Sequence, residues 1–517
     1  MFSSLNPYNT NNSPEQSSLC NKINYKLLTI IGLYLIITVP LAVHLNIWID
    51  ESFSLHATDN DLATAIDEAI SFGARPPVYF ILLFLWRQLH SSIFFARLLS
   101  ILLGVIFILL IPTLSKQYLP QLNPYWLTLL AAFNPYFIWA VLEIREYPLI
   151  LLWSALLLIT FFNGYLANHQ PRLNQIAYGF VAILSLYTYY YLAFILVSHG
   201  LILLIQRKWH KVRAFALCMF IDALLFIPYL AILKNQLSVA ESRNSSLKIS
   251  LSSLLSSIKY LTRMGVSLVF RKEIMSQDYA NHWFSYLIIA IVLMAILTLK
   301  HHLLTKISWS ILLLNLGLFG ILIAVINLLG QHTVLPRHLI LLFLPILLVT
   351  GLVIYLISHG IQSHSPKYIT LTLVSLILFL NLTSTYIIYQ PIAKEGDQKR
   401  VSTYLKQNVQ ASENVFVFSN CYHLALSYYD YGSGKLHPLP RELEFSRPSL
   451  EQQTLSPEET HQLLNNISQY HSIWWVKADF CDLNATCAQI NEFLTQNYTL
   501  KQEKQFYKAD VSLLEKT

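Results

Sequence analysis

The sequence has few charged residues. Asp, Glu, Lys and Arg make up 12% of its 517 residues, whereas hydrophobic residues make up 55%. A soluble globular protein carries about 25% charged residues, so this chain has too few to cover a water-exposed surface of its size. Tyrosine and phenylalanine are abundant, at 30 and 28 residues, which fits helices with aromatic belts at a membrane interface. The composition therefore predicts a membrane protein.

Cysteine is scarce, with five residues in the chain. Cys20 and Cys218 are isolated, and the other three lie near the C-terminal end. None has the CxxC or histidine spacing of a zinc site. If the C-terminal part is exported, Cys481 and Cys487 could form a local disulfide. Free thiols fit the sequence equally well.

Nucleotide-binding motifs are missing: the chain has no P-loop, no GxGxxG and no GxSxG. The net charge of +7 lies largely in short loops between apolar runs, a pattern of membrane topology rather than of nucleic-acid binding. A nucleotide-dependent cytosolic enzyme and a nucleic-acid partner are therefore not expected. No metal site is predicted, although a divalent cation as cofactor stays open.

Long apolar runs dominate the first three quarters of the chain. Residues 1–26 are polar and are expected to form a disordered cytoplasmic tail. A spanning helix needs about 20 apolar residues. We predict about 11 spans, and at most 13, at 27–45, 93–114, 125–142, 148–165, 175–190, 191–205, 214–233, 284–299, 307–329, 338–357 and 369–389. Segment 77–90 is too short to span and is expected to lie at the interface or to be re-entrant.

Loop charge predicts the orientation. The sequence QRKWHKVR at 206–213 is the strongest basic cluster, and the positive-inside rule places it in the cytoplasm. With the N-terminus inside, segments 46–92, 143–147, 234–282 and 330–337 lie outside. The predicted fold is a polytopic α-helical membrane protein with a small soluble α/β domain at 390–517. This domain is extracytoplasmic, on the outer face of the cell (inner) membrane.

Charged residues gather on that outer side. Asp50 and Glu51 follow the first span directly. They could serve acid–base chemistry on a substrate with a lipid tail, or be ordinary solvated loop charge, which is the commoner case. Arg75 precedes Pro76-Pro77, and Arg97 lies at the start of the next span. Each could bind phosphate or could extend its side chain to the interface.

Three further outer segments contain polar or charged residues at helix ends. Glu143, Arg145, Glu146 and Tyr147 form one cluster, where charges are costly unless they face water or each other. An interfacial helix cap would explain this cluster as well as a binding site would. Tyr189 belongs to a tyrosine run that is more simply an aromatic belt than a sugar-stacking site. Arg337 and His338 close the third segment and could bind phosphate or anchor a helix.

The order of these motifs resembles the GT-C superfamily of membrane glycosyltransferases, and more narrowly bacterial family 39, the protein-mannosyltransferase and aminoarabinose-transferase-like enzymes. The motifs are Trp-x-Asp-Glu at 48–51, Pro-Pro at 76–77, FARLLS at 95–100, NPYFIW at 134–139, Glu-x-Arg-x-Tyr at 143–147, YTYY at 187–190 and Pro-Arg-His at 336–338. The similarity runs from about residue 27 and continues weakly to Tyr429. Residues 27–389 would then be the catalytic domain.

The resemblance implies a polyprenyl-phosphate sugar donor and an acceptor lipid, glycan or protein. It places Asp50 as the catalytic carboxylate, with Glu51 completing the motif. Arg75 stands where relatives often have His or Lys. Because arginine does not donate a proton, the resemblance implies only that its positive charge interacts with the donor phosphate. Tyr189 stands where relatives often have His. Glu146 or Tyr147 lies near a second acidic position of some relatives. One base and direct attack predict inversion at the anomeric carbon.

The C-terminal segment is polar and of mixed pattern. We predict helices at 397–409 and 487–496, buried strands at 415–419 and 473–477, and a loop at 436–460. This domain could bind the acceptor, or could be a stabilising lid. Two other classes of function compete with glycosyl transfer. A transporter or lipid flippase should show mid-membrane charges and inverted repeats, and a structural or receptor-like protein leaves the acidic pair unexplained.

Overall fold

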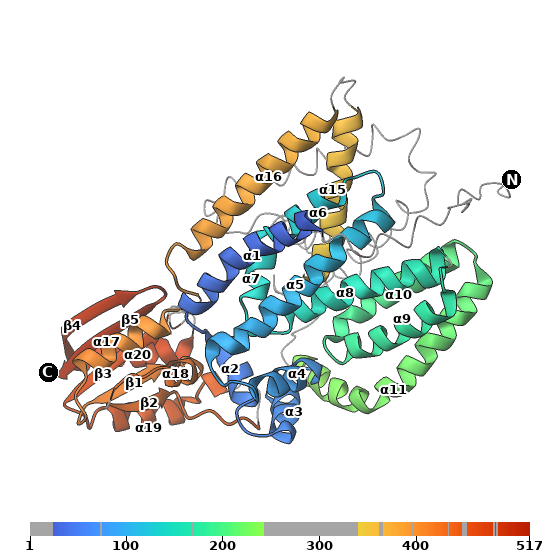
Figure 1. Ribbon diagram of the computed structural model, residues 1–517. Coiled ribbons are helices and arrows are strands. Elements are labelled where there is room, and N and C mark those ends of the chain that lie inside the picture. Colours follow the sequence, from blue (N-terminus) through green and yellow to red (C-terminus); the bar gives the residue numbers. More distant parts are fainter. Residues whose placement is uncertain are drawn as a thin grey trace, which may run out of the picture.

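A computed structural model describes residues 24–72, 75–167, 169–241, 340–360, 366–394, 396–432, 434–446, 452–478, 481 and 484–517. A bundle of helices carries a compact domain of strands and helices against one of its ends (Figure 1). The predicted spans 284–299 and 307–329, together with Arg337 and His338, lie outside the described residues.

Six helices of the described part are long and apolar enough to cross a membrane. They are α1 (Tyr25–His44), α5 (Ile93–Tyr118), α8 (Tyr147–Phe161), α11 (Trp209–Glu241), α15 (Phe343–Gly360) and α16 (Pro366–Tyr389). A π-helical turn, η2 (Phe162–Leu166), continues α8. Two shorter apolar helices, α9 (Pro171–Leu186) and α10 (Ala193–Ile205), match the two short predicted spans. The chain is thus a polytopic helical membrane protein, as expected.

The predicted single span 125–142 is wrong, because two helices replace it. They are α6 (Pro124–Ala132) and α7 (Pro135–Val141). Pro135 has no N–H to continue the first helix, and the Asn134 side chain accepts hydrogen bonds from the backbone N–H of Tyr136 at 2.8 Å and of Phe137 at 3.3 Å. Asn134 is therefore the N-cap of a new helix.

Segment 46–92 folds into three short helices at the end of the bundle near the soluble domain (Figure 1). They are α2 (Ile49–Ala57), α3 (Leu62–Ser71) and α4 (Val78–Arg87). The ten-residue helix α4 is too short to span a membrane, in agreement with the prediction for 77–90. These helices place the acidic pair at the junction of the bundle and the soluble domain.

The soluble domain is a five-stranded mixed sheet in the order β2-β1-β3-β5-β4. The strands are β1 (Asn414–Phe418), β2 (Lys435–Leu439), β3 (Ser472–Ala478), β4 (Tyr498–Phe506) and β5 (Ala509–Lys516). Strand β1 pairs in parallel with β2 and β3, and β5 pairs antiparallel with β3 and β4. Alternate residues of β1 face opposite sides of the sheet, so each side has its own core.

Two pairs of helices cover the two faces of this sheet. Helices α17 (Gln398–Asn408) and α18 (Asn420–Ser427) pack on the face that holds Val415 and Trp474. Helices α19 (Pro457–Ile467) and α20 (Ala485–Asn497) pack on the face that holds Phe416 and Trp475. The predicted α17, β1, β3 and α20 are confirmed. The predicted loop 436–460 is partly wrong, since it contains most of β2 and the start of α19.

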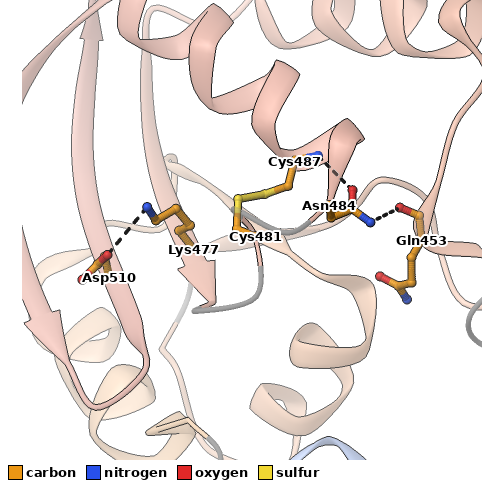
Figure 2. Close-up of a disulfide and its surroundings, with 6 residues drawn as sticks. All are labelled: Gln453, Lys477, Cys481, Asn484, Cys487 and Asp510. Carbon is orange, nitrogen blue, oxygen red and sulfur yellow. Dashed lines mark hydrogen bonds and ion pairs between the residues drawn. A yellow bond between two sulfur atoms is a disulfide. The ribbon is translucent and has the colours of Figure 1, made fainter. Parts of the chain in front are cut away.

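A disulfide joins Cys481 and Cys487, whose Cα atoms are 5.2 Å apart. Asn484, between them, accepts a hydrogen bond from the backbone N–H of Cys487 at 3.1 Å and so caps α20. The Asn484 amide donates to the backbone carbonyl of Gln453 at 3.1 Å, as Figure 2 shows. The disulfide therefore fixes the start of α20. Through Asn484 it also holds the segment that precedes α19.

Candidate active site

The acidic pair lies in the first turn of α2, directly after Trp48. Successive helical residues point about 100° apart, so the two carboxylates enter different surroundings. The Glu51 side chain is fully buried, whereas the Asp50 side chain is 16% exposed. One motif therefore supplies two carboxylates with separate roles.

Glu51 is the centre of a buried ion-pair network. Its Oε1 atom lies 3.0 Å from Nη2 of Arg97 and 2.9 Å from Nζ of Lys394. The backbone N–H of Ile144 donates to the same oxygen at 3.0 Å. Burial raises the pKa of Glu51, but Arg97 and Lys394 together outweigh it, so the pKa lies below its ordinary value. Glu51 is therefore ionised and held rigidly.

Glu143 shares the same lysine. Nζ of Lys394 lies 3.1 Å from Oε1 of Glu143 and donates to the Leu142 carbonyl at 2.7 Å. The indole N–H of Trp48 donates to the other Glu143 oxygen. Burial raises the pKa of Glu143 above its ordinary value, and Lys394 offsets only part of that rise. The network ties α2 to the loop before α8 through a cation from the segment after α16.

Arg97 is fully buried in the same network. Its Nη1 atom donates to the carbonyls of Ala42 at 2.8 Å and Leu45 at 3.1 Å, and its Nη2 atom to that of Asn46 at 3.1 Å. The Ala42 carbonyl lies in the last turn of α1, where carbonyls have no partner within the helix, and Leu45 and Asn46 follow the end of that helix. With its guanidinium surrounded by protein acceptors, the geometry argues against the predicted contact between Arg97 and a donor phosphate.

A second charged layer lies on the more exposed side of Asp50. Nη2 of Arg145 is 3.6 Å from Oδ2 of Asp50, and its Nη1 donates to the Asp50 carbonyl at 2.9 Å. Nε of Arg145 lies 3.7 Å from Oε2 of Glu146, whose other oxygen forms an ion pair with Arg75. Arg75 also interacts electrostatically with Tyr189. This layer joins four of the predicted site residues to Tyr189.

Tyr147 begins α8 beside this layer, with its ring centroid 4.9 Å from that of Trp139. It directly follows Glu146 in the chain and interacts electrostatically with Arg145. The structure thus gathers Asp50, Arg75, Arg145, Glu146, Tyr147 and Tyr189 around one layer and puts Glu51, Arg97 and Glu143 beneath it.

The soluble domain closes over the other side of α2. The Tyr429 hydroxyl accepts a hydrogen bond from the backbone N–H of Ile47 at 2.7 Å. Asn46 donates to the Gln398 side chain at 2.6 Å. Burial, followed by the negative charge of Asp50, raises the pKa of the Cys421 thiol to about 12. Cys421, in the first turn of α18, is thus a near neighbour of Asp50.

Lys394, Asn46 and Tyr429 are site residues that sequence reasoning missed. Lys394 lies in PIAKEGDQKR, a polar stretch with several basic residues in which nothing singles it out. Among the described residues, no group of three or more His, Cys, Asp or Glu side chains could hold a metal ion.

Solved structures share this fold, whereas no family model and no curated protein matches the sequence. The aminoarabinose transferase ArnT from Cupriavidus metallidurans, in the apo state, matches with a TM-score of 0.56 and 12% identity, over 94% of this chain and 98% of that one. The same enzyme bound to undecaprenyl phosphate matches with a TM-score of 0.57 and 10% identity, over 95% and 98%. An Archaeoglobus fulgidus oligosaccharyltransferase tethered to an acceptor peptide matches with a TM-score of 0.50 and 10% identity, over 93% and 73%. The chain therefore shares the fold of these solved structures, which is the fold expected from its resemblance to the GT-C superfamily.

Proposed function

We propose that this protein is a membrane glycosyltransferase that moves a sugar from a polyprenyl-phosphate donor to an acceptor hydroxyl or amine. The acceptor is a lipid, a glycan or a protein. The observation that carries the proposal is the partly exposed Asp50 carboxylate, with Arg145 beside it and Arg75 linked through Glu146. The site lies in a fold that a structure bound to undecaprenyl phosphate shares over 95% of this chain.

In the proposed reaction, Asp50 accepts the proton of the acceptor as the acceptor atom attacks the anomeric carbon. The bond from that carbon to the phosphate oxygen breaks, and the polyprenyl phosphate leaves with the bonding electron pair. Arg75 and Arg145 stabilise the charge that develops on the departing phosphate. Direct displacement inverts the anomeric configuration. The chain needs no covalent intermediate for this sequence.

Glu51 takes a positioning role in this proposal rather than a catalytic one. Its carboxylate is fully buried and is held by Arg97 and Lys394. It therefore does not reach a substrate, but it fixes the first turn of α2 and hence the direction of the neighbouring Asp50. Arg97 acts with it. This changes the sequence-based prediction that Glu51 is catalytic and that Arg97 binds the donor phosphate.

The proposed orientation puts the site outside the cytoplasm. The backbone N–H of Val78, at the start of α4, donates to the carbonyl of Tyr187, shortly before α10 begins, whereas the basic loop at 206–208 follows the C-terminal end of α10. The basic loop therefore lies at the far end of α10 from helix α4. The positive-inside rule assigns that loop to the cytoplasm. The Cys481–Cys487 disulfide agrees, because disulfides persist in oxidising compartments.

The test uses purified protein in lipid nanodiscs with a panel of undecaprenyl-phosphate sugars. Asp50→Asn should lower transfer by about 100- to 10,000-fold, the usual contribution of a general base, while undecaprenyl phosphate still binds. Asp67→Asn, on the exposed side of α3, removes the same charge and should leave transfer unchanged. Full transfer by Asp50→Asn would exclude Asp50 as the base. Movement of labelled lipid across the bilayer without a new glycosidic bond would instead support a transporter.

A further inference from the structure

Glu146 lies between Arg75 and Arg145, the two arginines of the second charged layer. Its side chain is 3% exposed. One carboxylate oxygen pairs with Arg75, and the other lies 3.7 Å from Nε of Arg145. The two guanidinium groups proposed to meet the donor phosphate therefore already share an anion that belongs to the protein.

Carboxylate and phosphate bind a guanidinium in the same way, through parallel N–H···O hydrogen bonds to two oxygens. A phosphate that reached either arginine would come within a few ångströms of the Glu146 carboxylate. Two anions repel strongly at such a distance when water is largely excluded. A donor phosphate and the present Glu146 carboxylate thus compete for the same positive charge.

We propose that Glu146 is an internal counterion that the donor phosphate displaces from Arg75 and Arg145. This inference rests on the proposed function, and it assigns to Glu146 the control of donor affinity and of product release. In the unliganded protein Glu146 neutralises and orders the arginines. When the lipid phosphate departs after transfer, Glu146 pairs with them again and favours its release.

The surroundings of Glu146 allow this exchange. Glu146 is the N-cap residue of α8, but its side chain makes no hydrogen bond to that helix, so a rotation of the side chain breaks no cap. Both arginines have other anchors. Nη1 of Arg145 donates to the Asp50 carbonyl at 2.9 Å, and the backbone N–H of Arg75 donates to the Ala69 carbonyl at 2.8 Å. One guanidinium nitrogen of Arg145 and the backbone of Arg75 therefore stay held when Glu146 leaves, and the Arg75 side chain is able to follow the incoming phosphate.

The experiment measures binding of undecaprenyl phosphate, with undecaprenol as the neutral probe, to full-length protein in nanodiscs. Glu146→Gln keeps the size of the side chain and removes its charge. We expect this variant to bind undecaprenyl phosphate about 5- to 100-fold more tightly than wild type, the range of a typical coupling between two sites, and to release it more slowly. Undecaprenol binding should not change.

Two further variants keep the test decisive. Asp67→Asn removes a charge from the exposed side of α3 and should leave both affinities at the wild-type value. Glu146→Asp retains the charge on a shorter side chain and should give a smaller gain in the same direction, which covers the case of a poorly folded Glu146→Gln. Equal or weaker binding of undecaprenyl phosphate by both Glu146 variants would overturn the counterion role. Failure of the wild type to bind it would instead overturn the proposed function.

Discussion

Lys394 shows how much one side chain contributes to this site. It is buried between Glu51 and Glu143 and lies within 3.1 Å of an oxygen of each. Two carboxylates so close together cannot both stay ionised in a buried site without a cation between them. Lys394 therefore allows Glu51 to stay ionised in its buried position, where it holds the first turn of α2 in place.

Lys394→Met keeps most of the side-chain volume and removes the charge. Loss of one partner from a buried ion pair costs about 3–5 kcal/mol, and we expect a lower midpoint of thermal unfolding in detergent. Adding Glu143→Gln removes one of the two carboxylates and should restore part of the loss. A single variant as stable as wild type, or a double variant less stable than the single one, would contradict this account of the network.

Helices α2 and α3 meet the soluble domain through an aromatic contact. The His56 ring stacks on Phe445 with centroids 3.7 Å apart, and Phe72 lies 4.9 Å from the same ring. Burial lowers the pKa of His56, while Asp59 opposes this shift, so the stacked ring is neutral at pH 7. Glu68, on α3, lies 3.6 Å from His56. Burial, with smaller contributions from Asp67 and Asp59, raises the pKa of Glu68 from 4.5 to about 7.

This shift predicts a pH dependence for the stability of the contact. Between pH 4.5 and 7 the folded protein holds a proton on Glu68 that the unfolded chain releases, so stability falls as pH rises through this window. The unfolding midpoint of wild type should therefore drop from pH 5 to pH 8 more than that of Glu68→Gln. Glu492→Gln, on the exposed side of α20, should follow wild type. Parallel profiles for wild type and Glu68→Gln would show that Glu68 does not titrate there.

Apolar runs predicted the helices well, because hydropathy is a local property. The sequence also contained a local sign that 125–142 is two helices, namely the N-cap residue Asn134 followed by Pro135. The prediction of spans relied on the length of apolar runs, and this segment is apolar throughout. Strand β4 has almost no sequence feature that predicts a strand. Its sequence YTLKQEKQF is exposed along most of its length at the edge of the sheet, so it lacks the apolar alternation of a half-buried strand.

The site residues could be predicted only in part, because some of their partners lie far away in the sequence. Asp50 and Arg75 stood out because charges beside apolar runs are rare. The distinction between a buried Glu51 and a partly exposed Asp50 depends on Lys394, more than 340 residues away in the chain. No spacing rule connects such residues, so the partner of a charge becomes known only from the folded chain.

At the scale of the whole molecule, the disulfide gives a test of the proposed orientation. If the soluble domain is exported, protein denatured without reductant should expose two fewer reactive thiols than protein denatured after reduction. A maleimide-linked polymer adds a fixed mass to each free thiol, so the mass shift of the protein gives the number of free thiols. The double variant Cys481→Ser, Cys487→Ser should show no difference, and its soluble domain should lose about 2 kcal/mol of stability, as closure of a short loop predicts. Equal thiol counts in wild type would place the domain in a reducing compartment.

The position of Lys394 and Tyr429 in the chain also has a consequence for biosynthesis. Both follow α16, after which the chain turns polar. Tyr429 bonds to Ile47 just before α2, and Lys394 pairs with Glu51 and Glu143. A ribosome that has delivered α16 to the membrane has not yet delivered the cation between Glu51 and Glu143. The network of Glu51, Lys394 and Glu143 can therefore form only after the segment that follows α16 has been synthesised, and a chain that stops at α16 lacks it.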